Sequence, residues 1–230
     1  MYQQQCGGLM WLTKTRPDIS FALSVACRGM SNPIRSDLVR IKRILDYVAN
    51  SQDIGLVWQV QGPFERIEDK PTTFDKISAV ADSDLAGRVE NSRSTSGYYV
   101  QFSETGMIFG VSQLQKVVSI STTHSELICA SECAKTVEWV KGFFDEIGLK
   151  TTKPILIQQD NQPAIALSNN PMYHFRTRHF RIAQHYLRDL VDRGILIMKY
   201  TPTKEMNADY LNKSQPPQRH LEIRLRCQNN

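Results

Sequence analysis

The sequence lacks several features that would place it in a common class of protein. No apolar run approaches the about 20 residues that a membrane-spanning helix needs, and there is no internal repeat or low-complexity tract. The five cysteines fall in no zinc-ligand pattern. Because their number is odd and no signal peptide precedes them, we expect reduced thiols and an intracellular protein, cytoplasmic or nuclear, that is not secreted.

The length and the composition of the chain indicate a folded protein with a hydrophobic core. Its 230 residues allow one domain, or one domain with a flanking subdomain, and its 41% hydrophobic content is enough for a core. The net charge of +5 permits a polyanionic partner without requiring one. The stretch 174–188, HFRTRHFRIAQHYLR, holds arginines and histidines and no acid, so it is either a solvated helix face or a phosphate-contacting surface.

Residues 1–58 are predicted to be helical. Pro17 suits a first helical position, and Asn32-Pro33 ends the segment that it begins. A second helix follows, with Leu38, Ile41, Leu45 and Val48 at helical spacing. Residues 59–75 are polar and turn-rich, and we expect a linker there. We expect Trp11, Trp58 and Trp139 to be packing residues.

Residues 76–215 are predicted to form an α/β domain. Three short strands, KISAVADSD, TSGYYVQFS and MIFGVSQ, precede a long helix from about His124 to Ile147. Strand and helix then alternate, through the strand PILIQQD, the helix QPAIALSNN, a helix over 177–192, the strand ILIMKYTP and a helix from about Asn207. This order predicts a mixed sheet flanked by helices, whose first three strands meander. We expect residues 216–230 to be a flexible tail.

Four acids lie at the ends of these predicted elements. Asp82 follows an apolar strand, Glu126 opens the long helix, Asp160 ends a strand and Asp209 lies in a first helical turn. Each also has a structural interpretation, as a turn former, the acid of a capping box with Thr123, an N-cap or a dipole-favoured acid respectively.

Considered together, the acids predict a metal centre. The predicted long helix carries apolar residues on the same face as Glu126, so that face packs on the sheet and the carboxylate points over it. If the strands that end in Asp82 and Asp160 are neighbours, three carboxylates converge, and their burial is costly unless a cation neutralises them. Hard oxygen ligands suit Mg²⁺ or Mn²⁺.

The motifs ADSDLAG, RSTSGYYV, STTHSELICASECAK, QDNQPAIALSNNP, RTRHFRI and TPTKEMNADYLNK resemble, in order and spacing, the ribonuclease H domain of copia-type LTR retrotransposon Pol polyproteins. The N-terminal stretches GGLMWLTKTRPDISFALSVACRGMSNP and RIKRILDYVANSQDIGLVW resemble the connection that follows the reverse transcriptase palm. The resemblance covers roughly residues 2 to 215. It implies a ribonuclease H-like fold with a five-stranded mixed sheet, preceded by a small helical connection segment over 1–58.

The resemblance also implies an activity and its residues. It implies cleavage of the RNA strand of RNA–DNA hybrids with two Mg²⁺ ions, or Mn²⁺, held by Asp82, Glu126, Asp160 and Asp209. Asp84 is the alternative to Asp82, because residues two apart lie on the same face of a strand. The partners implied are the hybrid and the rest of the Pol polyprotein, and the location implied is a virus-like particle in the cytoplasm, or the nucleus.

The nucleic-acid-binding residues predicted with this site are Ser94, Thr95, Asn161, Arg176, Arg178, His179 and Arg181. The basic residues suit a backbone-tracking surface for an A-form-like duplex. The segment around Ser94 and Thr95 equally fits a plain strand start, and Asn161 either contacts a 2′-OH or caps the following helix.

The sequence also departs from the family pattern. His124 stands where the family has an acid, Leu85 where it has an aromatic, and LNKSQP is an altered form of its usual LTKPL. The chain has no Asp-Asp dipeptide and lacks polymerase fingers and palm, so it is not expected to polymerise DNA. It is expected to be the C-terminal piece of a polyprotein, and a silent remnant that only binds nucleic acid or a partner is the alternative function.

Overall fold

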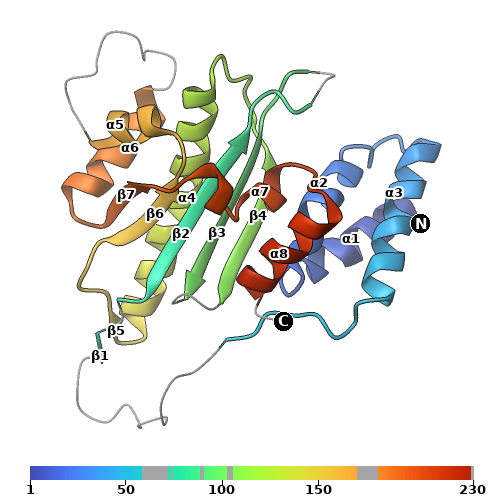
Figure 1. Cartoon of the computed structure of the whole chain (residues 1–230), viewed down its shortest axis with the longest axis horizontal. Coiled ribbons are helices and arrows are strands. Elements are labelled where there is room, and N and C mark those ends of the chain that lie inside the picture. Colours follow the sequence, from blue (N-terminus) through green and yellow to red (C-terminus); the bar gives the residue numbers. More distant parts are fainter. Residues whose placement is uncertain (59–71, 74, 89–90, 103–105, 170–180, 229–230) are drawn as a thin grey trace.

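The computed structural model of the chain describes residues 1–58, 72–73, 75–88, 91–102, 106–169 and 181–228. The predicted linker 59–75 therefore lies almost entirely outside the described residues, as do Arg176, Arg178 and His179. In the described part, helices cover both faces of one sheet and a separate helical unit stands beside it (Figure 1).

The central sheet has five strands in the order β4-β3-β2-β6-β7. The first three strands form the predicted antiparallel meander, and β6 and β7 then add in parallel beside β2. The mixed five-stranded sheet is therefore confirmed. Its strands are β2 (Ile77–Asp84), β3 (Thr95–Phe102), β4 (Met107–Leu114), β6 (Ile155–Gln159) and β7 (Leu196–Tyr200). A second, two-stranded parallel sheet pairs β1 (Thr72–Thr73) with β5 (Leu149–Lys150).

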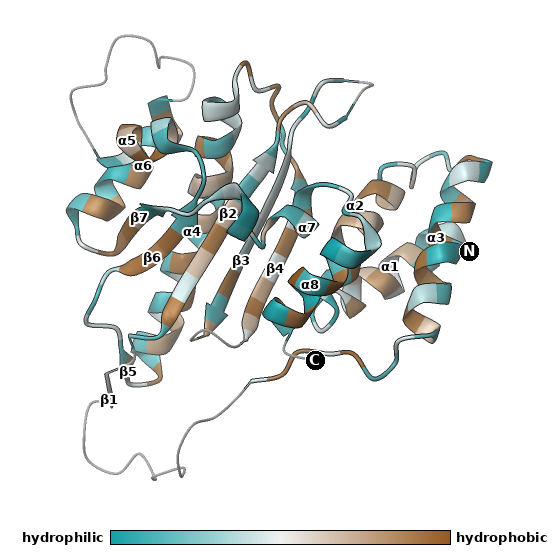
Figure 2. Ribbon diagram, in the orientation of Figure 1, coloured by the Kyte–Doolittle hydropathy of each residue, from teal (hydrophilic) through white to brown (hydrophobic). Residues whose placement is uncertain are grey.

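One face of the sheet packs on the long helix α4 (Thr122–Glu146), with α5 (Gln162–Asn169) and α6 (Arg181–Asp192) beside it. The predicted inward face of α4 is confirmed, since Ala130, Cys133, Val137 and Val140 are fully buried in this core. Figure 2 shows brown, hydrophobic segments along the strands of the sheet. This packing fixes the start of α4 above the ends of β2 and β6.

The opposite face is covered by α7 (Asp209–Asn212) and α8 (Pro217–Gln228), with the short helix η3 (Thr203–Glu205) before them. The prediction of a flexible tail over 216–230 is wrong, because residues 217–228 form α8. Pro217 occupies the first position of that helix, and Ile223 and Cys227, one turn apart, are buried against Tyr99 and Tyr210. Burial of these apolar side chains stabilises the helix.

The N-terminal unit comprises α1 (Tyr2–Leu12), η1 (Pro17–Ile19), α2 (Ser20–Cys27) and α3 (Arg35–Ala49) around its own core. In α3 the inward side chains are Ile41 and Ile44, whereas Leu38 and Leu45, which the spacing placed inside, are exposed. The three tryptophans predicted to pack are also largely exposed.

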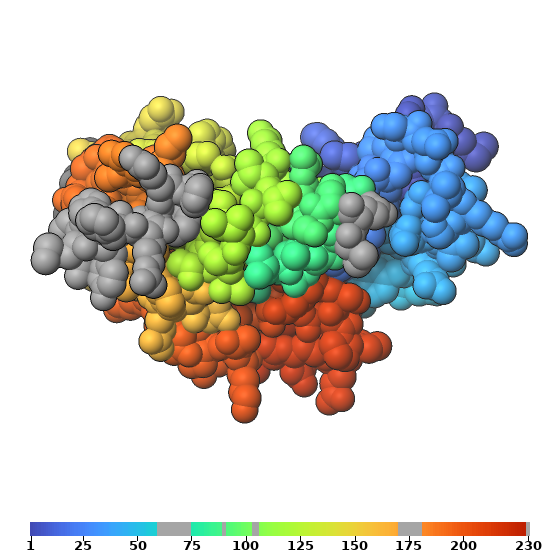
Figure 3. All heavy atoms as spheres, turned by 90° about the horizontal axis from the view of Figure 1, so that it is seen from above, coloured from blue at the N-terminus to red at the C-terminus, as the bar shows by residue number. Residues whose placement is uncertain are grey.

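The unit is joined to the rest of the protein by polar contacts. Ser24 Oγ and Ser112 Oγ of β4 lie 3.1 Å apart. The buried ion pair of Arg16 and Asp18 also meets α8, because the Gln228 side-chain amide donates to Asp18 at 3.2 Å. Figure 3 shows the blue N-terminal helices directly against the green strands at one end of the molecule. Among the described residues no helix combines the length and apolar character needed to cross a bilayer.

Candidate metal centre

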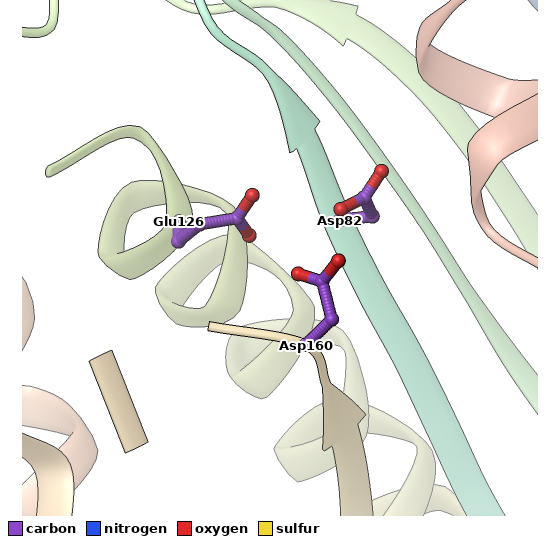
Figure 4. Close-up of side chains that lie close together, drawn as sticks. All are labelled: Asp82, Glu126 and Asp160. Carbon is purple, nitrogen blue, oxygen red and sulfur yellow. The ribbon is translucent and has the colours of Figure 1, made fainter. Parts of the chain in front are cut away.

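Three acids from separate elements meet at one end of the sheet. Strands β2 and β6 are parallel neighbours with Val80 opposite Gln158, so the same register, continued by two residues, places Asp82 beside Asp160. Glu126 reaches this point from the second turn of α4. Each of the three offers a carboxylate oxygen within 4.8 Å of the others, and all three side chains converge in Figure 4. The predicted convergence of these three acids is therefore present in the structure.

The site is buried and electrostatically unbalanced. Only 4% of Asp82 and 5% of Glu126 is exposed. Burial, followed by the neighbouring charge of Glu126, raises the pKa of Asp82 from 3.8 to about 8. Burial likewise raises the pKa of Glu126 from 4.5 to about 7, against the opposing effect of its hydrogen bonds to Ser83 and Gln159. Burial and mutual repulsion therefore disfavour the ionised forms of these acids.

Glu126 is held by groups far away in sequence. Its carboxylate accepts the Ser83 backbone N–H at 3.1 Å and the Gln159 side-chain amide at 2.9 Å. The capping-box interpretation of Glu126 is wrong, because α4 begins two residues earlier than that motif requires. The N-cap is Ser121, whose hydroxyl accepts the His124 N–H at 3.1 Å. The Glu126 carboxylate therefore faces the strand ends rather than the end of its own helix.

Asp209, the fourth predicted acid, opens α7 and lies next to Asp82 on the other side from Glu126. In addition to burial and the charge of Glu126, a side-chain hydrogen bond with Asp209 raises the pKa of Asp82. Lys213, one turn after Asp209, places its Nζ 2.5 Å from Asp209 Oδ1 and 3.7 Å from Asp82 Oδ2. Asn212 donates its side-chain amide to Asp82 Oδ2 at 2.7 Å.

The close approach of α7 depends on a glycine. Gly97 of β3 lies opposite Asp82 in the sheet, and a Cβ at Gly97 would stand 2.9 Å from the backbone of Leu211 and Asn212. A residue with a side chain would therefore push α7 away from the sheet. Gly97 allows Asp209 and Asn212 to reach Asp82.

Asp84 lies outside the group of three carboxylates. Its side chain packs against the turn at Gly87, where a Cβ would collide with the Asp84 carboxylate, and its pKa is raised by burial. The geometry therefore favours Asp82 over Asp84 as the acid that joins Glu126 and Asp160.

The predicted nucleic-acid-binding residues differ in where they lie and in how far they are exposed. Ser94 is 0% exposed and Thr95 is 1% exposed, and their contact with nucleic acid stays a prediction. Ser94 accepts the Ala86 N–H and Thr95 accepts from Arg28, so both hydroxyls serve internal contacts. Asn161 caps α5 by accepting the Ala164 N–H at 2.9 Å.

Arg181, in contrast, is exposed at the start of α6. It lines a cavity of about 550 Å³ between the end of β4, α4 and α6, together with Lys116 and Lys135. Of the basic cluster predicted to contact phosphates, Arg181 is the member that the described residues include.

Sequence reasoning missed the residues that orient the acids, namely Ser83, Gln159, Asn212 and Lys213. Gln159 and Asn212 are fully buried polar side chains, and each retains a buried oxygen without a hydrogen-bond partner. Their positions directly beside Asp160 and within one turn of Asp209 were the available signal.

The donor set fits a hard divalent cation. Three carboxylates, without a histidine or cysteine among them, offer the oxygen ligands that Mg²⁺ and Mn²⁺ prefer. Burial raises the pKa of Asp82 and of Glu126, and a bound cation would oppose that shift by favouring the ionised carboxylates. The residues present therefore fit a divalent ion.

Comparison with known proteins places the chain among retrotransposon polyproteins. It is 36% identical over 216 residues to the retrovirus-related Pol polyprotein from transposon TNT 1-94 of Nicotiana tabacum and 31% identical over 212 residues to that from transposon RE1 of Arabidopsis thaliana. These alignments cover 94% and 92% of this chain but only 15% and 14% of the polyproteins. The chain thus spans about one seventh of the length of these relatives.

A shorter relative is the secreted RxLR effector protein 161 of Plasmopara viticola. It is 31% identical over 140 residues, which is 60% of this chain and 90% of the effector. No family model matches the chain.

Solved structures with a similar arrangement include ribonucleases H. LC11-RNase H1 in complex with an RNA/DNA hybrid has a TM-score of 0.46 at 11% identity and covers 60% of this chain and 94% of its own. The foamy viral protease-reverse transcriptase in complex with an RNA/DNA hybrid has a TM-score of 0.44 at 12% identity and covers 86% of this chain and 28% of its own. We assign the fold from the strand order, 3-2-1-4-5 in chain order, and the helices that flank the sheet. The chain belongs to the copia-type retrotransposon Pol polyproteins, as a homologue of one region of them that has a ribonuclease H-like fold.

Proposed function

We propose that this protein is a retrotransposon-derived ribonuclease H that hydrolyses the RNA strand of RNA–DNA hybrids endonucleolytically with two divalent ions, Mg²⁺ or Mn²⁺. The observation that carries the proposal is the group of Asp82, Glu126 and Asp160, whose carboxylate oxygens lie within 4.8 Å of one another at the end of the sheet. Membership of the Pol family and the ribonuclease H-like strand order support the same activity.

Asp82, Glu126 and Asp160 would hold one ion, and Asp82 with Asp209 would hold the second. When bound, two such ions activate a water and stabilise the leaving oxygen of a phosphodiester. The protein's own contribution is to fix the ligands. Ser83 and Gln159 orient Glu126, Asn212 orients Asp82, and Thr203 donates its hydroxyl to Asp160 at 2.7 Å.

The substrate would approach along the basic side of the site. Arg181 and Lys135 line the cavity between α4 and α6, and Arg176, Arg178 and His179 precede Arg181 in the sequence. Such side chains contact the phosphate backbone of a duplex without reading its sequence. In an intact element the rest of the Pol polyprotein would be the protein partner.

The test is a hybrid-cleavage assay in Mg²⁺ and in Mn²⁺ that compares wild type with Asp160→Asn. An Asn at 160 can still accept the Thr203 hydroxyl but lacks the ligand charge, so we expect folding to persist and the cleavage rate to fall at least about a hundredfold, or ~2.7 kcal/mol. Asp53→Asn, at an exposed aspartate after α3, makes the same change of charge and should cleave like wild type.

The alternative, a silent remnant that only binds nucleic acid or a partner, gives a different result. Folded wild-type protein would then bind the hybrid equally well with and without EDTA and release no product in either metal. That outcome would reject the proposed activity.

A further inference from the structure

Lys213 places a positive charge inside the acidic centre. Its Nζ lies 2.5 Å from Asp209 Oδ1 and 3.7 Å from Asp82 Oδ2, and it follows directly after α7. The two carboxylates are 11% and 6% exposed, whereas the lysine side chain is 38% exposed. A cation of the protein itself thus bridges Asp82 and Asp209, the one of the four acids that lies outside the group of three carboxylates.

The four acids divide into two cation positions around Asp82. Asp82 with Glu126 and Asp160 forms the group whose oxygens lie within 4.8 Å of each other. Asp82 with Asp209 forms the second position, where the Lys213 ammonium lies. In Figure 4 one Asp82 oxygen turns toward Glu126 and Asp160 while the other points away from them. Asp82 can therefore serve both positions.

An ammonium group and a divalent ion cannot share the second position. Both need the same oxygens of Asp82 and Asp209, and like charges at such a distance repel strongly where water is largely excluded. Lys213 has a flexible four-carbon stem that begins at a partly exposed position, so it can turn toward solvent without unfolding α7.

We propose that Lys213 occupies the second cation position in the metal-free protein and that the second divalent ion binds only when this lysine leaves. The inference rests on the proposed metal centre but does not require hydrolysis. Lys213 is in this view a positioning residue: it holds Asp82 and Asp209 together before loading and makes the second ion bind more weakly than the first. The occupancy of the site is consequently ordered, with the Asp82, Glu126 and Asp160 position filled first.

The experiment is a calorimetric titration of the full chain with Mn²⁺, and Mn²⁺ paramagnetic resonance reports the number of bound ions. Wild type should show a tighter and a weaker step. Lys213→Met keeps the length of the stem and removes the charge, and its weaker step should tighten about twofold to fivefold, the range expected when one partly exposed ion pair no longer has to break. Lys42→Met, on the exposed face of α3, changes the net charge equally and should titrate like wild type.

A second measurement keeps the inference testable if Lys213→Met is less stable. In EDTA its unfolding temperature should fall below that of wild type, because Asp82 and Asp209 lose their counter-charge, and saturating Mn²⁺ should remove the difference. Lys213→Gln should behave in the same way. A weaker step that is unchanged or weakened in both variants overturns the inference, as does a single step in wild type and variants alike. If the titrations show the two expected steps but the protein does not cleave the hybrid, the proposed function is rejected and this inference still holds.

Discussion

Gln159 donates its side-chain amide to the Glu126 carboxylate at 2.9 Å and to the Glu126 backbone oxygen at 3.0 Å, across 33 positions of sequence. These hydrogen bonds connect the start of α4 to Gln159, which is the last residue of β6 and directly precedes Asp160. Since Gln159 is fully buried, its amide is a fixed part of the site rather than a solvent-exposed contact. The orientation of one acid and the position of the next are thereby coupled.

Glu126→Gln should separate the chemical role of this position from its structural role. A glutamine can still accept the Ser83 N–H. Its new amide can donate to the Gln159 oxygen, which has no partner in the wild type, if the Gln159 amide turns over and gives up its bond to the Glu126 backbone oxygen. We expect the free energy of unfolding to stay within about 0.5 kcal/mol of wild type, while hybrid cleavage falls at least about a hundredfold. Denaturant unfolding and the cleavage assay measure the two effects.

Ser121→Ala is the matched variant for the structural role. It removes the N-cap of α4 and should cost about 1 kcal/mol of stability, with cleavage retained at temperatures where the protein is folded. A stability loss in Glu126→Gln that matches the Ser121→Ala loss, with cleavage intact, would return Glu126 to a capping role.

Gly97→Ala should disturb the site through the backbone. The added methyl would meet the backbone of Leu211 and Asn212 at 2.9 Å, so α7 must move and the Asn212 contact to Asp82 lengthens. We expect a loss of about 1–3 kcal/mol in stability, together with weaker Mn²⁺ binding. Denaturant unfolding and calorimetry test this.

Gly142→Ala is the control for that substitution. Gly142 lies within α4 and a Cβ there meets nothing within 4 Å, so alanine should stabilise the helix by about 0.5–1 kcal/mol and leave metal binding unchanged. Equal metal affinity in both glycine variants would show that α7 does not need the close approach at Gly97.

The sequence predicted the features that depend on local pattern. Alternating apolar residues located the strands, and the apolar face of the long helix was correctly oriented over the sheet. Asp82 and Asp160 lie at the ends of parallel neighbouring strands, and Glu126 lies near the start of the helix that packs over them. Periodicity and chain order were therefore sufficient for the mixed sheet and for three acids of the site.

Features that depend on tertiary partners were not predictable in this way. Thr123 and Ser121 both suit an N-cap, and the packing of α4 on the sheet decides between them. Ser94 and Thr95 look like surface residues in sequence, but the N-terminal unit supplies Arg28 against Thr95. The tail forms a helix because Tyr210 and Tyr99, the latter distant in sequence, provide the surface that buries Ile223.

Ile223→Ala tests whether α8 is an integral part of the fold. Ile223 is fully buried against the second face of the sheet, so its truncation should cost about 2–5 kcal/mol by loss of burial and the cavity left behind. Leu221→Ala, two residues away and 43% exposed, should change stability by no more than about 0.5 kcal/mol. Urea unfolding measures both, and similar values for the two variants would mean that α8 is detached in solution.

The stability of the metal-free protein should fall as the pH rises. In the folded chain the pKa of Asp82 is raised from 3.8 to about 8 and that of Glu126 from 4.5 to about 7. At a pH between the ordinary and the raised pKa of each group, the folded protein therefore binds more protons than the unfolded one. Stability contributed by these groups is therefore complete below about pH 4 and is lost progressively as the pH approaches 8. Mg²⁺ competes with the same protons, so its stabilising effect should grow over the interval in which the metal-free protein weakens.

Thermal unfolding at pH 6 and at pH 8, in EDTA and in Mg²⁺, measures this linkage. We expect the Mg²⁺-dependent rise in unfolding temperature to be larger at pH 8, and Glu126→Gln to show a smaller difference between the two pH values, because one of the two raised carboxyls is gone. Asp53→Asn, which alters an exposed carboxyl, should retain the wild-type difference. An Mg²⁺ effect that is the same at both pH values would mean that protons and the ion do not compete for Asp82 and Glu126.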